Sequence, residues 1–146
     1  MNNLNKFSEK FSGKEYLEAT SIGRKYFKAK EELLSLKKKI GLQPHTIGVP
    51  LGEDTKKGFR PSLYLLERLS LDASQKIFVN DKAEWLFLCG RDVLEKSIIK
   101  DNSKNEICLV QNEKDENLGL GKKIVRGKSV TIKNIIDRGD FLRREK

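Results

Sequence analysis

Residues 118–128 read Leu-Gly-Leu-Gly-Lys-Lys-Ile-Val-Arg-Gly-Lys, and this segment constrains the fold more than any other part of the chain. Leucine and glycine alternate in its first half, a period that is typical of a strand with one inward-facing apolar side. Gly119 and Gly121 carry no side chain, so another backbone segment or a ligand can approach the strand closely. Basic residues follow on the same edge, where they can reach phosphates. We therefore expect this edge to contact RNA through four side chains, Lys122, Lys123, Arg126 and Lys128.

Positive charge is concentrated at the C-terminal end of the chain. Of 146 residues, 30 are Lys or Arg and 21 are Asp or Glu, which gives a formal net charge of +9. Residues 1–75 hold 14 basic and 9 acidic side chains, residues 76–117 hold 7 and 9, and residues 118–146 hold 9 and 3. Such sorting favours a polyanionic partner, either a nucleic acid or an anionic membrane surface. The alternative is that the excess only keeps a Lys-rich protein soluble.

Residues with the chemistry of catalysis or metal binding are few. His45 is the only histidine and lies in a stretch rich in proline and glycine, so no Ser/His/Asp or Cys/His arrangement can be assembled. Cys89 and Cys108 stand in apolar surroundings, where we expect small buried thiols rather than a disulfide or a metal site. Residues 119–122 lack the Ser or Thr that follows the lysine of a phosphate-binding P-loop. We expect no enzyme activity, no cofactor and no bound metal.

The start of the sequence does not resemble a secretory signal. It reads Met-Asn-Asn-Leu-Asn-Lys, and no apolar run approaches the roughly 18 residues that a membrane-spanning helix requires. We therefore expect an intracellular, cytoplasmic protein without a membrane partner.

The first half of the chain predicts short strands around one longer helix. The clearest pattern is a helix over residues 28–40, where Leu33, Leu36 and Ile40 fall on one face and Gly41 can end it. The other expected elements are a short strand suggested by Phe7, Phe11 and the alternation at 16–20, a turn at 21–24, a strand at Tyr26 and Phe27, a loop over 43–58 and a helix from about 61 to 71. Together they predict a small α/β domain over residues 1–75.

The second half predicts a small barrel of short strands. Trp85 and Phe87 lie among leucines and are expected in its core, although either could stack on RNA bases. The expected elements are strands at 76–79, 107–111, 118–125 and 129–136, a helix at 82–89 and a helical turn at 91–96. We place the domain boundary at residues 72–75, so the second domain covers residues 76–146 and the fold class is α+β.

This second half resembles the PUA domain, named for pseudouridine synthase and archaeosine transglycosylase. The resemblance runs through Lys76-Ile77-Phe78-Val79, Ala83-Glu84, Phe87-Leu88, Gly90 and Val93-Leu94, continues with Leu118-Gly119-Leu120-Gly121, and closes on Asp-Arg-Gly-Asp-Phe-Leu-Arg at residues 137–143. It implies a C-terminal PUA-type β-barrel that binds RNA. We add Arg138 and Arg143 of the closing segment to the expected RNA-binding residues.

The first half resembles the Nip-seven family of ribosome-biogenesis factors. Phe59-Arg60, followed by apolar residues and a short helix, runs without a gap into Lys76-Ile77, and Tyr26-Phe27 leads into the helix around residues 31–40. The family occurs in archaea and eukaryotes, and the compact chain and its Asp-Arg-Gly ending favour an archaeal member. The resemblance implies a factor without enzyme activity that binds precursor ribosomal RNA during large-subunit maturation, beside other ribosome-assembly proteins. In a eukaryotic host it would be nucleolar.

Two other functions stay open at this level. PUA domains also occur in RNA-modifying enzymes, so the chain could be a non-catalytic subunit of such an enzyme. It could also be a protein-interaction adaptor whose first domain docks a partner while the basic end only keeps it soluble.

Overall fold

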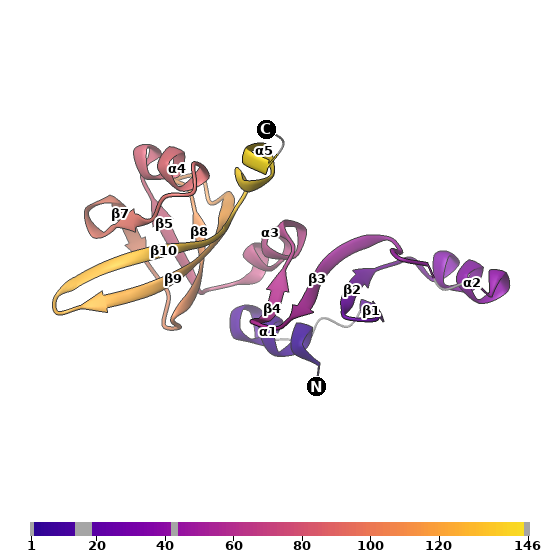
Figure 1. Ribbon diagram of the computed structural model, residues 1–146. Helices are drawn as coiled ribbons and strands as arrows, with labels where there is room; N and C mark the ends of the chain where they lie inside the picture. The colour runs from indigo at the N-terminus through magenta and orange to yellow at the C-terminus, as the bar shows by residue number, and fades with distance from the viewer. Residues whose placement is uncertain (1, 14–18, 42–43, 145–146) are drawn as a thin grey trace. The chain divides into compact units, whose positions relative to one another are not determined.

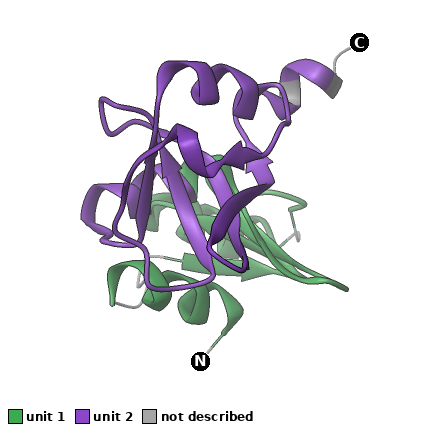
Figure 2. Ribbon diagram, turned by 90° about the vertical axis from the view of Figure 1, so that its left-hand side faces the viewer, with its two compact units in different colours: residues 1–65 green, residues 66–146 purple. Residues whose placement is uncertain are grey.

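The computed structural model describes residues 2–13, 19–41 and 44–144, and the chain forms two compact units, Met1–Leu65 and Leu66–Lys146 (Figures 1 and 2). The division falls earlier than the boundary expected at residues 72–75. It falls inside α3 (Leu63–Asp72), whose Glu67 pairs with Arg138 Nη2 of the second unit at 3.5 Å. The helix expected over residues 61–71 is thus present, and most of it belongs to the second unit.

The first unit is a four-stranded antiparallel sheet with a helix against one face. The strands pair in chain order, β1 (Ala19–Ile22), β2 (Lys25–Lys28), β3 (Val49–Thr55) and β4 (Gly58–Pro61). On the face that meets α1 (Asn3–Ser12), the Phe59 ring lies 5.3 Å from the Phe7 ring. Asp54 on the same face accepts hydrogen bonds from Asn3 Nδ2 at 3.1 Å and from the Tyr26 hydroxyl at 2.8 Å.

The first helix is a correction to the strand expected around Phe7 and Phe11. Leu4, Phe7 and Phe11 recur at helical spacing and are all buried, and the Asn2 side chain caps the helix by accepting from the Asn5 N–H at 2.8 Å. Residues 14–18 of the expected alternation lie outside the described residues. Ser21 and Ile22 of the expected turn belong to β1, so the turn comprises residues 23 and 24 only, and the following strand is confirmed as β2.

A hairpin replaces most of the loop that we expected over residues 43–58. Strand β3 contains Pro50 and Gly52, which normally disfavour a strand. Tyr26 pairs with Gly52 and Phe27 with Pro50, so the intervening Leu51 forms a β-bulge that accommodates both. A side chain at position 52 would collide with the Phe59 ring on the α1 side of the sheet. Strand pairing and packing therefore override the local propensity.

The helix expected over residues 28–40 is confirmed as α2 (Glu31–Ile40), which ends at Gly41 with φ of 71°. Its expected apolar face does not become a buried one. None of its residues is buried, and Leu33, Leu36 and Ile40 are all exposed.

The second unit is a half-barrel of six short strands with a helix across one end (Figures 1 and 2). The strand order is β6-β10-β9-β8-β5-β7, antiparallel except for the parallel pair β5–β8. Its elements are β5 (Lys76–Val79), α4 (Asp81–Leu88), β6 (Val93–Leu94), η1 (Glu95–Ser97), β7 (Ile98–Asp101), β8 (Ile107–Gln111), β9 (Asn117–Arg126), β10 (Ser129–Asp137) and α5 (Asp140–Arg144).

Strands β5, β8, β9 and β10 and helix α4 confirm the predicted elements of this half. The helical turn expected over residues 91–96 is wrong in its first part, where Val93 and Leu94 pair with β10 as β6 before a single 3-10 turn. Strand β7 was not predicted, because its sequence Ile-Ile-Lys-Asp has no period of two.

The core of the half-barrel joins the strands to α4. Ile77, Val79, Cys108 and Ile132 are buried in it together with Ala83 and Phe87 of the helix. Ala83 and Phe87 are four residues apart and share one helix face. Phe87 is therefore confirmed as a core residue, whereas the expected burial of Trp85 is wrong. Trp85 lies on another face of α4 and is 67% exposed.

Gly119 and Gly121 give room to the protein itself and not to a ligand. Both are buried. A Cβ atom on Gly119 would overlap the Ile136 carbonyl of β10, and one on Gly121 would collide with Ile132 Cγ2. Of the two possibilities that the sequence left open, close approach of another backbone is the one the fold uses.

Replacing Gly119 by Ala should destabilise the second unit strongly, because the new methyl group has no space against β10. Gly127→Ala is a matched control, since Gly127 also has positive φ but a Cβ atom there would meet no other atom within 4 Å. We expect Gly119→Ala to lower the free energy of unfolding by roughly 2 kcal/mol more than Gly127→Ala does. Urea titrations of both variants measure the difference, and equal losses would contradict the packing role of Gly119.

Candidate nucleic-acid interface

The β9–β10 hairpin extends beyond its neighbouring strands and carries basic side chains at its end. Strand β8 pairs with β9 only as far as Lys122, and β6 pairs with β10 only at Thr131 and Ile132. The tip of the hairpin therefore pairs only with itself and projects from the half-barrel (Figure 1). Arg126 and Lys128 lie in this tip, and both are exposed.

Two further lysines face each other across the same hairpin. Lys122 of β9 and Lys133 of β10 are direct cross-strand partners, so their side chains lie on one side of the sheet. Like charges in this position repel. Glu106 offsets the repulsion only in part, at 3.5 Å from Lys122 Nζ and with both side chains well exposed. We call Lys122, Arg126, Lys128 and Lys133 the hairpin cations.

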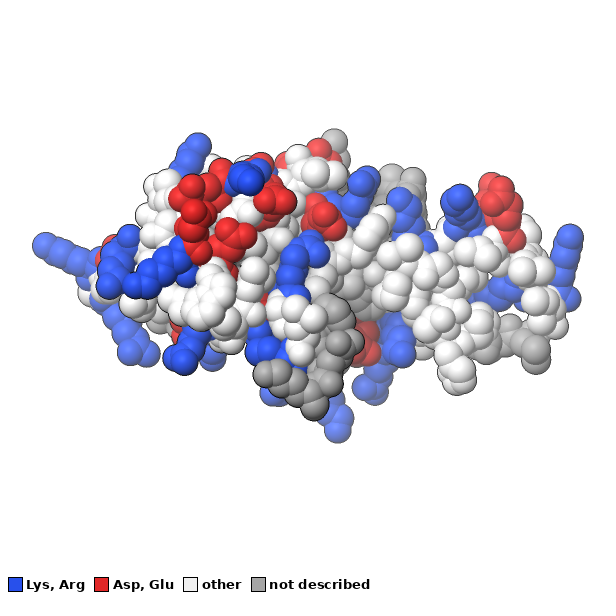
Figure 3. All heavy atoms as spheres, turned by 90° about the horizontal axis from the view of Figure 1, so that it is seen from above, with Lys and Arg blue, Asp and Glu red and all other residues white. Residues whose placement is uncertain are grey.

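Among the described residues, the side chains of Arg126, Lys128 and Lys133 have no ion-pair partner. Lys133 was not among the residues expected from the sequence. Its position opposite Lys122 follows from the turn at residues 127 and 128, which pairs Arg126 with Ser129 and continues in one register to Lys133. Figure 3 shows basic side chains extending from the hairpin end of the second unit, while acidic side chains gather over α4.

Lys123, the neighbour of Lys122, points to the other side of the sheet and has an internal role. Its Nζ lies 2.7 Å from Asp101 Oδ2 and donates to the Ser103 carbonyl at 3.1 Å. Partial burial raises the pKa of Asp101, but the hydrogen bonds from Lys123 and Ser103 outweigh this effect and leave the pKa lowered. Lys123 thus ties β9 to β7 and the loop that follows it.

Arg138 and Arg143 are also occupied within the fold. Arg138 Nε donates to the Asn117 carbonyl at 2.6 Å, at the start of β9. Arg143 forms two parallel hydrogen bonds with Asp137, of 3.0 and 2.9 Å, and donates to the Leu88 carbonyl at 2.7 Å. The Asp137 side chain is only 3% exposed, so Arg143 neutralises a buried carboxylate and holds α5 to the end of α4.

The structure therefore sorts the six residues expected to bind RNA into two groups. Lys122, Arg126 and Lys128 lie together on the hairpin with Lys133, whereas Lys123, Arg138 and Arg143 make contacts that hold the half-barrel together. Whether any of them contacts RNA stays a prediction.

Other candidate chemistry can be placed as well. Cys108 is buried, and burial raises the pKa of its thiol to about 12, while Cys89 is exposed and both are free. His45 is exposed before β3. Within residues 2–13, 19–41 and 44–144, no three His, Cys, Asp or Glu side chains are grouped so as to hold a metal ion. The helices in these ranges are all too short or too polar to cross a membrane.

Residues 75–146 match the family model described as the UPF0113 PUA domain. Two archaeal proteins named UPF0113 protein are similar to the chain. The protein from Archaeoglobus fulgidus is 33% identical over 115 residues, which cover 72% of this chain and 66% of the relative. The protein from Aeropyrum pernix is 32% identical over 103 residues, which cover 68% of this chain and 58% of the relative. The chain thus spans just under two thirds of the first relative and less of the second.

A solved structure agrees with these matches. It is described as a conserved PUA domain protein from Thermoplasma acidophilum, and it superimposes with a TM-score of 0.51 at 25% sequence identity, over 66% of this chain and 69% of the other. The expected fold class, α+β with a C-terminal PUA-type β-barrel, is confirmed, and the strands of the barrel form a half-barrel. The comparisons support a PUA-domain protein with archaeal relatives.

Replacing Lys123 by Met should destabilise the fold in a pH-dependent way. The pKa of Asp101 lies below its ordinary value of 3.8 in the folded chain. The stability that the ionised Asp101 gives the fold is therefore complete above pH 3.8, and it is lost as the pH falls through the lowered pKa of the folded state. We expect Lys123→Met to cost ~1 kcal/mol of unfolding free energy at neutral pH. The cost should shrink as Asp101 becomes protonated below about pH 4.

Lys122→Met is the matched control, because it removes the same charge from the next residue, where the ion pair is longer and more exposed. Its unfolding free energy should change by less than about 0.5 kcal/mol. Denaturant titrations at several pH values measure both variants. A pH-independent loss in Lys123→Met would contradict the tie to Asp101.

Proposed function

We propose that the chain binds RNA through the hairpin cations, since residues 75–146 match the family model described as the UPF0113 PUA domain. The observation that carries the proposal is the concentration of exposed positive charge at the projecting end of the β9–β10 hairpin. The domain type itself suggests RNA binding, and the hairpin is where this chain offers phosphates an accessible cationic surface that acidic side chains barely compensate.

The proposed contact is electrostatic and independent of base sequence. Arg126 and Lys128 lie at the tip, where a phosphate backbone can approach from several directions. Lys122 and Lys133 repel each other in the free protein, and a phosphate bound between them would relieve that repulsion. RNA would thus find four cations within one short hairpin.

The biological role that we propose is that of a non-enzymatic ribosome-biogenesis factor. Its RNA would be a precursor of ribosomal RNA during large-subunit maturation, and other assembly proteins would be its partners in the cytoplasm. The resemblance of residues 24–146 to the Nip-seven family supports this role. The arrangement of Lys123, Arg138 and Arg143 restricts the proposed RNA contact to the hairpin cations.

Replacing Arg126, Lys128 and Lys133 together by Ala should weaken binding to all RNA sequences alike. The slope of log affinity against log salt concentration should flatten by roughly 0.7 for each phosphate of a single strand that the variant no longer neutralises. Fluorescence anisotropy with labelled single-stranded RNA, at several salt concentrations, measures both quantities. An unchanged affinity and slope would dispose of the hairpin site.

The matched control replaces Lys82, Arg91 and Lys114 by Ala. These are also exposed cations of the second unit, but they lie on or beside α4 and in the β8–β9 turn. Their removal changes the net charge equally and should affect RNA binding much less.

Purification of the tagged protein from cells tests the proposed role in ribosome biogenesis. Co-purifying pre-ribosomal particles support this role, and a stable complex with an RNA-modifying enzyme contradicts it.

A further inference from the structure

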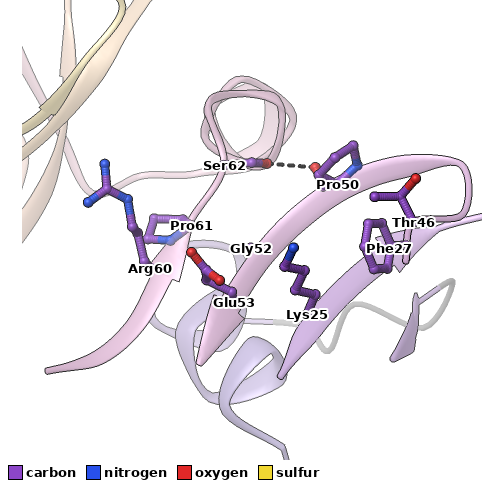
Figure 4. Close-up of a pocket in the computed structure, with 9 residues that line it drawn as sticks. All are labelled: Lys25, Phe27, Thr46, Pro50, Gly52, Glu53, Arg60, Pro61 and Ser62. Carbon is purple, nitrogen blue, oxygen red and sulfur yellow. Dashed lines mark hydrogen bonds between the residues drawn. The ribbon is translucent and has the colours of Figure 1, made fainter. Parts of the chain in front are cut away.

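The first unit contains a pocket of about 290 Å³ on the sheet face opposite α1 (Figure 4). Side chains along a strand alternate between the two faces. Tyr26, Asp54 and Phe59 meet α1, so their neighbours Glu53 and Arg60 point the other way. The pocket is lined by Lys25, Phe27, Thr46, Pro50, Gly52, Glu53, Arg60, Pro61 and Ser62.

Three charged side chains form one row across this pocket. Glu53 of β3 is the cross-strand partner of Lys25 on β2 and of Arg60 on β4, so the carboxylate lies between two cations. No ion pair or side-chain hydrogen bond joins any of the three to another residue of the described chain. Their donors and acceptors are therefore available to a ligand.

The rest of the pocket is apolar and well fixed. Phe27, Pro50 and Pro61 line it, and because Phe27 and Pro61 are buried, Pro50 presents the exposed apolar surface beside the charged row. The Ser62 hydroxyl donates to the Pro50 carbonyl at 2.8 Å and accepts from the Leu65 N–H at 3.1 Å. These bonds hold the wall of the pocket at the start of α3.

The charge pattern restricts the kind of ligand. A simple anion such as inorganic phosphate would be attracted by Lys25 and Arg60 but repelled by Glu53. A purely apolar ligand would leave all three charges without partners. The pocket fits a ligand that combines an anionic group, a flat apolar body and an edge of hydrogen-bond donors. A nucleotide has these three parts, and the net positive charge of the row favours its phosphate over the single carboxylate of a peptide.

We propose that this pocket binds a guanine nucleotide, either free or as one residue of a single-stranded RNA. An ionised carboxylate only accepts hydrogen bonds, and guanine presents two adjacent donors, N1–H and the N2 amino group, that can meet both oxygens of Glu53. The base then lies against Pro50, which is exposed beside the charged row, and the long side chains of Lys25 and Arg60 hold the phosphate. The site is separate from the hairpin cations and does not depend on them.

Calorimetric titration of the full chain with GMP and with inosine monophosphate tests the proposal, because inosine lacks only the N2 amino group. GMP should bind about tenfold more tightly than inosine monophosphate. Glu53→Gln should remove this preference, and Arg60→Ala or Lys25→Ala should weaken GMP binding about tenfold. Circular dichroism checks that these exposed or isosteric changes leave the fold intact.

Lys57→Ala is the matched control, since it removes the same charge from the β3–β4 turn outside the pocket and should leave GMP binding unchanged. Equal affinities for the two nucleotides, an equal loss in Lys57→Ala, or displacement of GMP by the tripeptide Gly-Lys-Glu at similar concentration would overturn the proposal. The oligonucleotide UUGUU distinguishes RNA from a free nucleotide as the source of the guanine. If UUGUU binds more tightly than GMP and Arg60→Ala abolishes its binding, the site binds RNA. If GMP binds and UUGUU does not, the site binds a free nucleotide. The hairpin variant should keep its GMP affinity, so failure at one site is distinguishable from failure at the other.

Discussion

The second unit depends on the close contact of β9 and β10 at two glycines. With no side chain at Gly119 or Gly121, the backbone of β10 can lie against β9 while Ile132 fills the interior. The same contact sets the register that brings Asp137 to the end of the sheet, where Arg143 neutralises it. The packing of β10, its register against β9 and the Asp137–Arg143 ion pair thus all depend on the missing side chains at Gly119 and Gly121.

Elements whose residues share a local period could be predicted from the sequence. Strand β5, helix α4 and the separate strands β9 and β10 follow from apolar alternation, capping residues and turns. Strand β3 could not, because a bulge and distant packing accommodate Pro50 and Gly52. The first helix was missed because its apolar spacing was interpreted as part of an extended segment. Trp85 was misplaced because leucines lie next to it in sequence, while the helix turns its side chain to an exposed face.

The candidate site shows the same division between local and distant information. The basic run on β9 is visible in the sequence, but alternation sends Lys122 and Lys123 to opposite sides of the sheet. Only the fold brings Asp101 to Lys123 and Asp137 to Arg143, so only the fold separates cations that hold the protein together from cations that are accessible to a polyanion. Lys133 joins the accessible group through strand pairing.

Because Lys122 and Lys133 face each other on β9 and β10, the stability of the hairpin depends on ionic strength. Dissolved counter-ions screen repulsion between exposed charges, over a distance of about 8 Å at physiological salt. Added salt should therefore tighten the tip of this ribbon while it weakens attraction to polyanions. A bound phosphate backbone supplies the same screening locally, so occupancy and hairpin rigidity are thermodynamically linked. The hairpin proposed to bind RNA would then be most ordered in its RNA-bound state.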